Sequence, residues 1–212
     1  MIQFAVERMP AVRGIHFQPV SYFGRYPEAP ADKDRITIPE VITAIERQTE
    51  GKMKSSDFRP PSAENAYCSF HGNFVLLANG EFLTWTREEE QQGCCCQPRL
   101  AGEGARKAQA FVAKRWAAPR ERGEISPVQP DALPAVNTDS LDSFLERTEK
   151  YSFSISGMAF QDVWNLDLER LRECFIHVVG PEQRIIPFCA YNLTDITGKA
   201  LYRPDYNSPV TP

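Results

Sequence analysis

The sequence predicts an α+β fold with two β-hairpins and several amphipathic helices. Residues 73–77 and 81–85 are short apolar segments on either side of Asn79-Gly80, a dipeptide typical of two-residue hairpin turns. A second pair of strand-like segments, 175–179 and 185–188, is joined by the turn Gly-Pro-Glu-Gln. Apolar residues at helical spacing indicate helices elsewhere in the chain. The two hairpins and these helices together define the predicted class.

The first 56 residues look like the end of an α/β unit. A short helix over 4–9 precedes a strand over 14–20. We expect Thr37 to cap a second helix, because Glu40 stands at the third helical position and completes a capping box. One strand and one helix cannot close a sheet. The rest of this sheet is therefore expected to be missing from the chain or to come from a partner.

Composition divides the chain into five segments. A helix over 102–116 follows the first hairpin, and four prolines between residues 119 and 134 then indicate a linker. Helices over 140–149 and 167–172 precede the second hairpin. The segments are a barrel-like end (1–56), a cysteine-rich hairpin with a helix (57–118), a proline-rich linker (119–138), a C-terminal region (139–203) and a loose tail (204–212).

The charge and hydropathy pattern excludes several classes of protein. The 24 Lys and Arg residues are outnumbered by 28 Asp and Glu, giving a net charge of −4, which argues against a nucleic-acid partner. No apolar run approaches the ~18 residues that a membrane span needs. Glu7 and Arg8 stand where a secretory signal would be apolar, so we expect a cytoplasmic protein.

The cysteines are grouped around the two predicted hairpins. One cysteine precedes the first hairpin and three consecutive cysteines follow it, while the last two bracket the second hairpin. A hairpin returns the chain to its starting point, so thiols on its two sides can meet around a metal. All six are candidate metal ligands: Cys68, Cys94, Cys95, Cys96, Cys174 and Cys189.

The residues alone leave three interpretations of these thiols open. Disulfides are disfavoured because we expect a reducing compartment. Thiolates in such a chain suit an iron–sulfur cluster, or a zinc site in which His71 is a further candidate ligand close to Cys68. The third interpretation is that Cys174 and Cys189 are small buried apolar side chains. His16 and His177 lie in strand-like segments and are expected to be structural. No catalytic residue is indicated.

Four motifs occur together along the chain. They are residues 12–25 (VRGIHFQPVSYFGR), Cys68-Ser-Phe-His-Gly, the triple cysteine before a helix that ends Lys114-Arg115-Trp116, and Ile186-Pro-Phe-Cys189-Ala-Tyr-Asn-Leu-Thr. In combination they resemble the C-terminal part of radical SAM proteins, in the group related to the tetraether lipid synthase and pterin methylase-like enzymes. The resemblance covers nearly the whole chain to Arg203.

This resemblance implies a fold and a set of cofactors. The first segment would be the remnant of a partial (β/α) barrel, namely its last strand and helix, followed by the cysteine-rich α+β region with its two hairpins. Gln18 and Pro19 would then lie beside S-adenosylmethionine. The cysteines would hold an auxiliary iron–sulfur cluster of the 4Fe-4S type.

The chain departs from the family in one respect. It has no Cys-x3-Cys-x2-Cys motif, which the family uses to hold the cluster that cleaves S-adenosylmethionine. We therefore expect a truncated product, a split subunit or a fragment that does not cleave S-adenosylmethionine by itself. Its expected partner is a separate chain with the rest of the barrel, and S-adenosylmethionine would bind only with that barrel. The alternative is a zinc-stabilised binding module without catalysis.

Overall fold

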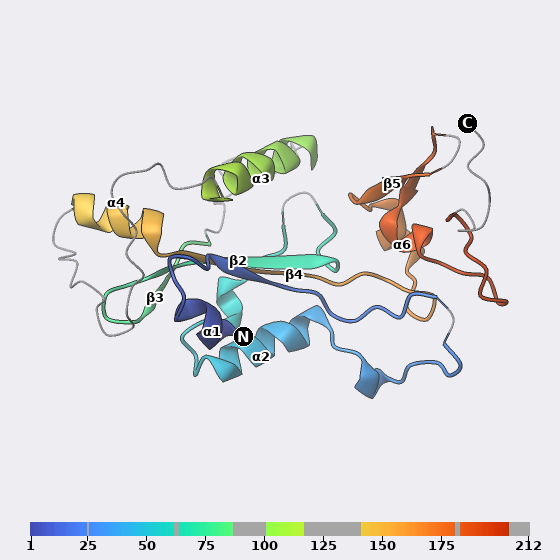
Figure 1. The fold of residues 1–212 in the computed structure, drawn as a ribbon, viewed down its shortest axis with the longest axis horizontal. Coiled ribbons are helices and arrows are strands. Elements are labelled where there is room, and N and C mark those ends of the chain that lie inside the picture. The colour runs from blue at the N-terminus through green and yellow to red at the C-terminus, as the bar shows by residue number, and fades with distance from the viewer. Residues whose placement is uncertain (25, 62–63, 87–100, 117–140, 181–182, 204–212) are drawn as a thin grey trace, which may run out of the picture.

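A computed structural model shows a mixed α+β protein with one four-stranded and one two-stranded sheet (Figure 1). The residues that the structure describes are 1–24, 26–61, 64–86, 101–116, 141–180 and 183–203. Across these ranges, no helix is both long enough and apolar enough to cross a membrane.

The described segments contain six α-helices, two short 3-10 helices and six strands. The helices are α1 (Ile2–Val6), η1 (Asp32–Asp34), α2 (Ile38–Gln48), η2 (Ser55–Asp57), α3 (Ala101–Trp116), α4 (Leu141–Lys150), α5 (Leu168–Arg172) and α6 (Phe188–Tyr191). The strands are β1 (Gly14–Phe17), β2 (Ser69–Leu76), β3 (Phe82–Thr84), β4 (Ser152–Met158), β5 (His177–Val179) and β6 (Ile185–Pro187).

The four-stranded sheet joins strands from three distant parts of the chain. Its order is β1-β4-β2-β3, with β1 parallel to β4 and β2 antiparallel to both β4 and β3. Phe17 pairs with Gly157 near the carboxyl ends of β1 and β4. At the same end, the backbone N–H of Ala159 donates to the carbonyl of Cys68, just before β2 begins, at 2.8 Å. The carboxyl ends of the two parallel strands therefore meet the start of β2.

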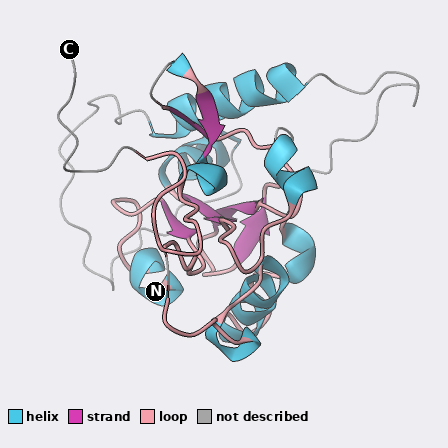
Figure 2. Ribbon diagram, turned by 90° about the vertical axis from the view of Figure 1, so that its right-hand side faces the viewer, coloured by secondary structure: helices cyan, strands magenta, loops and turns pink. Residues whose placement is uncertain are grey.

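One face of this sheet forms the hydrophobic core. Phe74, Phe153 and Ile155 are fully buried in it, together with side chains from α1 and α2. Gly72 lies on the same face under Phe58, where a side chain larger than hydrogen would meet the Phe58 ring at 2.7 Å. Figures 1 and 2 show α2 on this side of the sheet and α3 on the opposite side. The sheet is thus a layer between helices, with a polar second face.

Both predicted hairpins are confirmed. β2 pairs with β3 across a turn in which Gly80 has a φ of 80°, and β5 pairs with β6. The first hairpin begins at Ser69 rather than at residue 73, because β2 extends to pair with β4 as well. The predicted capping box of α2 is also present, since the Glu40 carboxylate accepts from the Thr37 backbone N–H at 2.7 Å.

β4 is absent from the sequence-based expectations, although it lies at the centre of the fold. Its sequence, SFSISGM, alternates serine with Phe153 and Ile155, and its apolar positions are the buried ones. That alternation is typical of a strand with one polar face. The partial-barrel origin of the first segment stays a prediction. The linker at 119–138 lies outside the described residues.

Candidate functional site

Three of the six cysteines lie at the carboxyl end of the parallel strands. Cys68 immediately precedes β2, Cys174 follows α5, and Cys189 is a buried residue of α6. Figure 1 shows β5 and α6 beyond this end of the four-stranded sheet. We call these residues, Cys68, Cys174 and Cys189, the thiol cluster. Each is a free cysteine.

Burial, a hydrogen bond and nearby charges all act on the pKa of the Cys189 thiol. Burial raises the pKa of the Cys189 thiol, while the backbone N–H of Gln161, which donates to Cys189 Sγ at 3.2 Å, lowers it. Negative charge on Cys174 and on Cys68 raises this pKa further, and the Arg170 guanidinium lowers it. Hydrogen bonds place two of these cysteines beside the loop after β4: the Cys68 carbonyl accepts from the Ala159 N–H, and Cys189 Sγ accepts from the Gln161 N–H.

Arg170 contacts the thiol cluster directly. Its Nη2 donates to Cys68 Sγ at 3.4 Å and to the carbonyl of Ala159 at 3.3 Å. Asp167 caps α5, the helix that carries Arg170, by accepting from the backbone N–H of Glu169 at 2.9 Å. Sequence reasoning placed a helix here but did not select Arg170, because nothing local indicates that this arginine faces Cys68.

Hydrogen bonds and aromatic contacts hold the three cysteine-bearing segments together. Asn65 Nδ2 donates to Glu173 Oε2 at 2.5 Å, which links the loop before Cys68 to the residue before Cys174. The Phe188 ring, next to Cys189, lies 4.7 Å from the ring of Phe160 in the loop after β4. These contacts join the loop before Cys68 to the end of α5, and α6 to the loop after β4.

A buried ion pair anchors the loop after β4. The Arg35 guanidinium binds the Asp162 carboxylate through two hydrogen bonds of 3.0 and 2.9 Å, and the Asp162 side chain is 1% exposed. The same carboxylate accepts from the backbone N–H groups of Tyr22 at 2.7 Å and Trp164 at 3.0 Å. Because Asp162 follows Gln161, this network fixes the N–H group that donates to Cys189.

The residues predicted to contact S-adenosylmethionine lie at the same end of the sheet. Gln18 and Pro19 directly follow β1, whose last residue, Phe17, pairs with Gly157. Gln18 is exposed and Pro19 is buried. Ser21 Oγ donates to the carbonyl of Phe160 at 3.0 Å, so the chain after β1 runs beside the chain after β4.

The other predicted ligands lie outside the described residues. Cys94, Cys95 and Cys96 belong to the segment 87–100, whose placement the structure does not describe. Within the described ranges, no group of three or more His, Cys, Asp or Glu side chains stands at metal-binding geometry.

The polar face of the sheet carries a row of histidine, serine and histidine. Ser156 of β4 is paired with His16 of β1 on one side and with His71 of β2 on the other. His16 Nδ1 and Ser156 Oγ share a hydrogen bond of 2.9 Å. His16 is thus a sheet residue, as predicted. His71 lies within β2 and not in the loop before it.

His71 is expected to make the folded protein sensitive to acid. Burial lowers its pKa from the ordinary value of 6.5, and the charge of Glu64 opposes this shift only in part. The unfolded chain then binds a proton at a higher pH than the folded chain does, so the free energy of unfolding falls as the pH drops through 6.5.

The His71→Gln variant should therefore lose less stability than the wild type between neutral pH and about pH 5. Denaturant unfolding at a series of pH values measures this difference. His177→Gln, which replaces an exposed histidine of β5, is the matched control and should follow the wild-type profile. If the free energy of unfolding depends on pH equally in all three proteins, His71 is not the source of the acid sensitivity.

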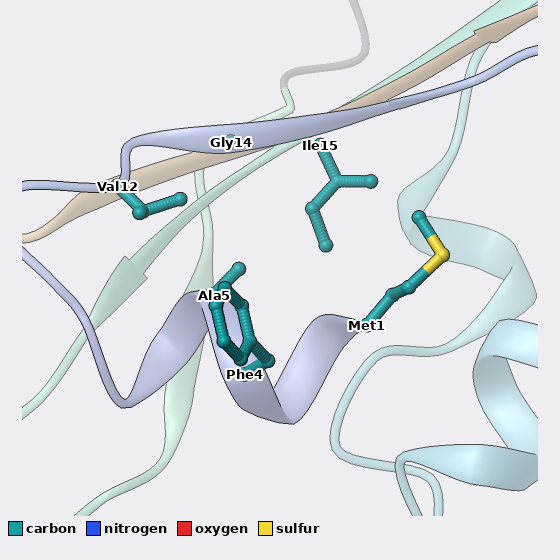
Figure 3. Close-up of a pocket in the computed structure, with 6 residues that line it drawn as sticks. All are labelled: Met1, Phe4, Ala5, Val12, Gly14 and Ile15. Atoms are coloured by element: carbon teal, nitrogen blue, oxygen red, sulfur yellow. The ribbon is translucent and has the colours of Figure 1, made fainter.

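The outer edge of β1 has no partner strand in the part of the chain that the structure describes. Ser154 N–H donates to the carbonyl of Arg13, so the alternate residues Gly14 and His16 direct their backbone groups toward this edge. An apolar hollow of about 550 Å³ lies beside it (Figure 3). It is lined by Met1, Phe4, Ala5, Val12, Gly14 and Ile15.

Comparison with known proteins gives one relation. No family model matches the sequence. The chain is similar to the 7,8-dihydro-6-hydroxymethylpterin dimethyltransferase of Methanocaldococcus jannaschii, with 29% identity over 227 aligned residues. The match takes in 91% of this chain and 44% of the relative, so the chain spans less than half the length of that protein. The predicted relation to pterin methylases is supported, whereas the correspondence to a C-terminal part stays a prediction.

Proposed function

We propose that this chain is the part of a radical SAM methyltransferase that holds an auxiliary iron–sulfur cluster. The thiol cluster would supply three ligands, and one cysteine of the triplet 94–96 would supply the fourth. The observation that carries this proposal is that Cys68 and Cys189 both border the loop after β4: Arg170 binds Cys68 Sγ and the Ala159 carbonyl, and Gln161 donates to Cys189 Sγ. In open α/β sheets, ligands bind outside the carboxyl end of parallel strands.

The surroundings of the thiols fit such a cluster. Iron–sulfur clusters are held by cysteine thiolates and stabilised by hydrogen bonds to sulfur. Gln161 and Arg170 already donate to the sulfur atoms of Cys189 and Cys68. The positive charge of Arg170 offsets the negative charge that thiolate ligands bring. When bound, the cluster would supply one-electron transfer or a binding point for substrate, while this chain's residues hold and orient it.

The similarity to a pterin dimethyltransferase supports a proposal for the substrate of the complete enzyme. We infer that the complete enzyme methylates a reduced pterin, with S-adenosylmethionine bound once the rest of the barrel is present. Gln18 and Pro19, at the end of β1, are the residues of this chain proposed to lie beside that cofactor. This position is on the same end of the sheet as Cys68.

The partner proposed for this chain is a polypeptide that carries the part of the relative outside the alignment. It would add a parallel strand to the free edge of β1 and place an apolar side chain in the hollow of Figure 3. Phe4, which is 57% exposed there, is an expected contact.

Co-expression of the two polypeptides followed by affinity measurement tests this partner. Phe4→Glu is expected to weaken the complex about tenfold or more, because a charge would be placed in an apolar contact. Ile196→Glu, at an exposed residue far along the chain, is the matched control and should bind as the wild type does. A failure of the wild-type chain to form any complex would contradict the proposal.

Anaerobic reconstitution with iron and sulfide tests the proposed cluster. We expect about four iron and four sulfide per chain, with visible absorption that bleaches on reduction. Zinc retained through purification, with no sulfide taken up, would replace this proposal with a zinc-stabilised binding module, which unfolds on chelation. A colourless chain that binds neither metal would overturn both.

A further inference from the structure

The Arg170 side chain is held between the backbone and the thiol cluster. Its Nη2 lies within hydrogen-bonding distance of both Cys68 Sγ and the Ala159 carbonyl, at 3.4 and 3.3 Å. The two contacts attach one guanidinium to the start of β2 and to the end of β4 at the same time. The fold therefore fixes where the Arg170 guanidinium lies.

The same guanidinium has a donor left over. Arg170 Nε is buried and finds no hydrogen-bond acceptor among the residues that the structure describes. A buried donor without an acceptor is unfavourable, so a group that accepts at this place would be stabilised by it. Arginine presents its donors in a rigid planar fork, and Nη2 already donates to a thiol sulfur. A second sulfur atom beside Cys68 would be such an acceptor.

We propose that Arg170 is a positioning residue for the iron–sulfur cluster, an inference that rests on the function proposed above. The guanidinium holds Cys68 through Nη2 and donates from Nε to an inorganic sulfide or a further thiolate of the centre. Its positive charge also stabilises the reduced, more negative cluster. Loss of that charge should therefore favour the oxidised form and shift the reduction potential to a more negative value.

Two variants of Arg170 and one control test this role in the full chain after anaerobic reconstitution. Arg170→Met keeps the length of the side chain without its charge, whereas Arg170→Lys keeps the charge without the planar fork. Arg172→Met removes an exposed arginine from the same helix, α5, and is the matched control. The readouts are the rate of iron loss to a chelator and the reduction potential from a dye-mediated titration.

We expect Arg170→Met to lose iron about 10- to 100-fold faster than the wild type and to have a more negative potential. Arg170→Lys should keep the wild-type potential, because the charge remains, and lose iron at an intermediate rate. Arg172→Met should match the wild type in both measurements. Circular dichroism of the metal-free proteins shows whether each variant is folded.

The outcomes separate this inference from the function on which it rests. A wild-type chain that takes up no iron and sulfide overturns the proposed function and this role of Arg170 with it. If the wild type loads and Arg170→Met equals it in iron retention and potential, the role of Arg170 alone is overturned. A potential that changes equally in Arg170→Met and Arg172→Met also overturns it, because the effect would then come from general surface charge.

Discussion

Cys189→Ser is expected to abolish incorporation of the iron–sulfur cluster. Cys189 is the buried member of the thiol cluster, at 7% exposure, and its sulfur accepts a hydrogen bond from Gln161. A hydroxyl of similar size leaves the packing nearly unchanged but is a poor ligand for iron compared with a thiolate. Iron and sulfide analysis after reconstitution should show loss of most of the bound metal.

Cys189→Ser also introduces a buried hydroxyl, and a substitution at the next residue is the control for that effect. Ala190→Ser adds a hydroxyl to the next residue of α6, which is 5% exposed, and leaves every thiol in place. This variant should load as the wild type does. Full incorporation by Cys189→Ser would show that Cys189 is a buried apolar residue, the third interpretation that the sequence left open.

Asp162→Ala is expected to destabilise the metal-free protein by about 3 to 5 kcal/mol, the cost of removing one partner of a buried ion pair. The substitution would leave the Arg35 guanidinium, which is 18% exposed, without its carboxylate. It would also remove the acceptor for the backbone N–H groups of Tyr22 and Trp164. Denaturant unfolding followed by circular dichroism measures the change.

A nearby exposed carboxylate provides the control for this experiment. Asp32→Ala, in the short helix η1, should change the free energy of unfolding by no more than about 0.5 kcal/mol. The double variant Asp162→Leu with Arg35→Met should recover much of the lost stability, because neither buried charge then remains. An Asp162→Ala protein as stable as the Asp32→Ala protein would contradict the proposed anchoring of this loop.

Local patterns in the sequence were sufficient to predict much of the secondary structure. The Thr37 capping box, the Asn79-Gly80 turn and the Asp167–Arg172 helix each depend on residues close together in the chain. β4 was missed because its alternate serines lower the apolar content of the segment. The pairing of β1 with β4 joins residues about 140 positions apart, as in Gly14 with Ser154, and no local signal specifies it.

The candidate site shows the same division between local and long-range information. The hairpins predicted that Cys68 would meet the triplet 94–96 and that Cys174 would meet Cys189; the triplet lies outside the described residues, so the first pairing stays a prediction. They did not indicate that Cys68 of the first hairpin and Cys189 of the second would both border the loop after β4, because this depends on how distant segments pack. Arg170 and Asp162 were missed for the same reason: their partners, Cys68 and Arg35, are more than 100 residues away in sequence.

The most direct test of the account is an anomalous-scattering map, collected at the iron absorption edge, from crystals of the anaerobically reconstituted chain. We predict iron density bonded to the sulfur atoms of Cys68, Cys174 and Cys189, at the ~2.3 Å typical of metal–thiolate bonds. Density held by other residues, with these three sulfur atoms free of metal, would contradict the central claim.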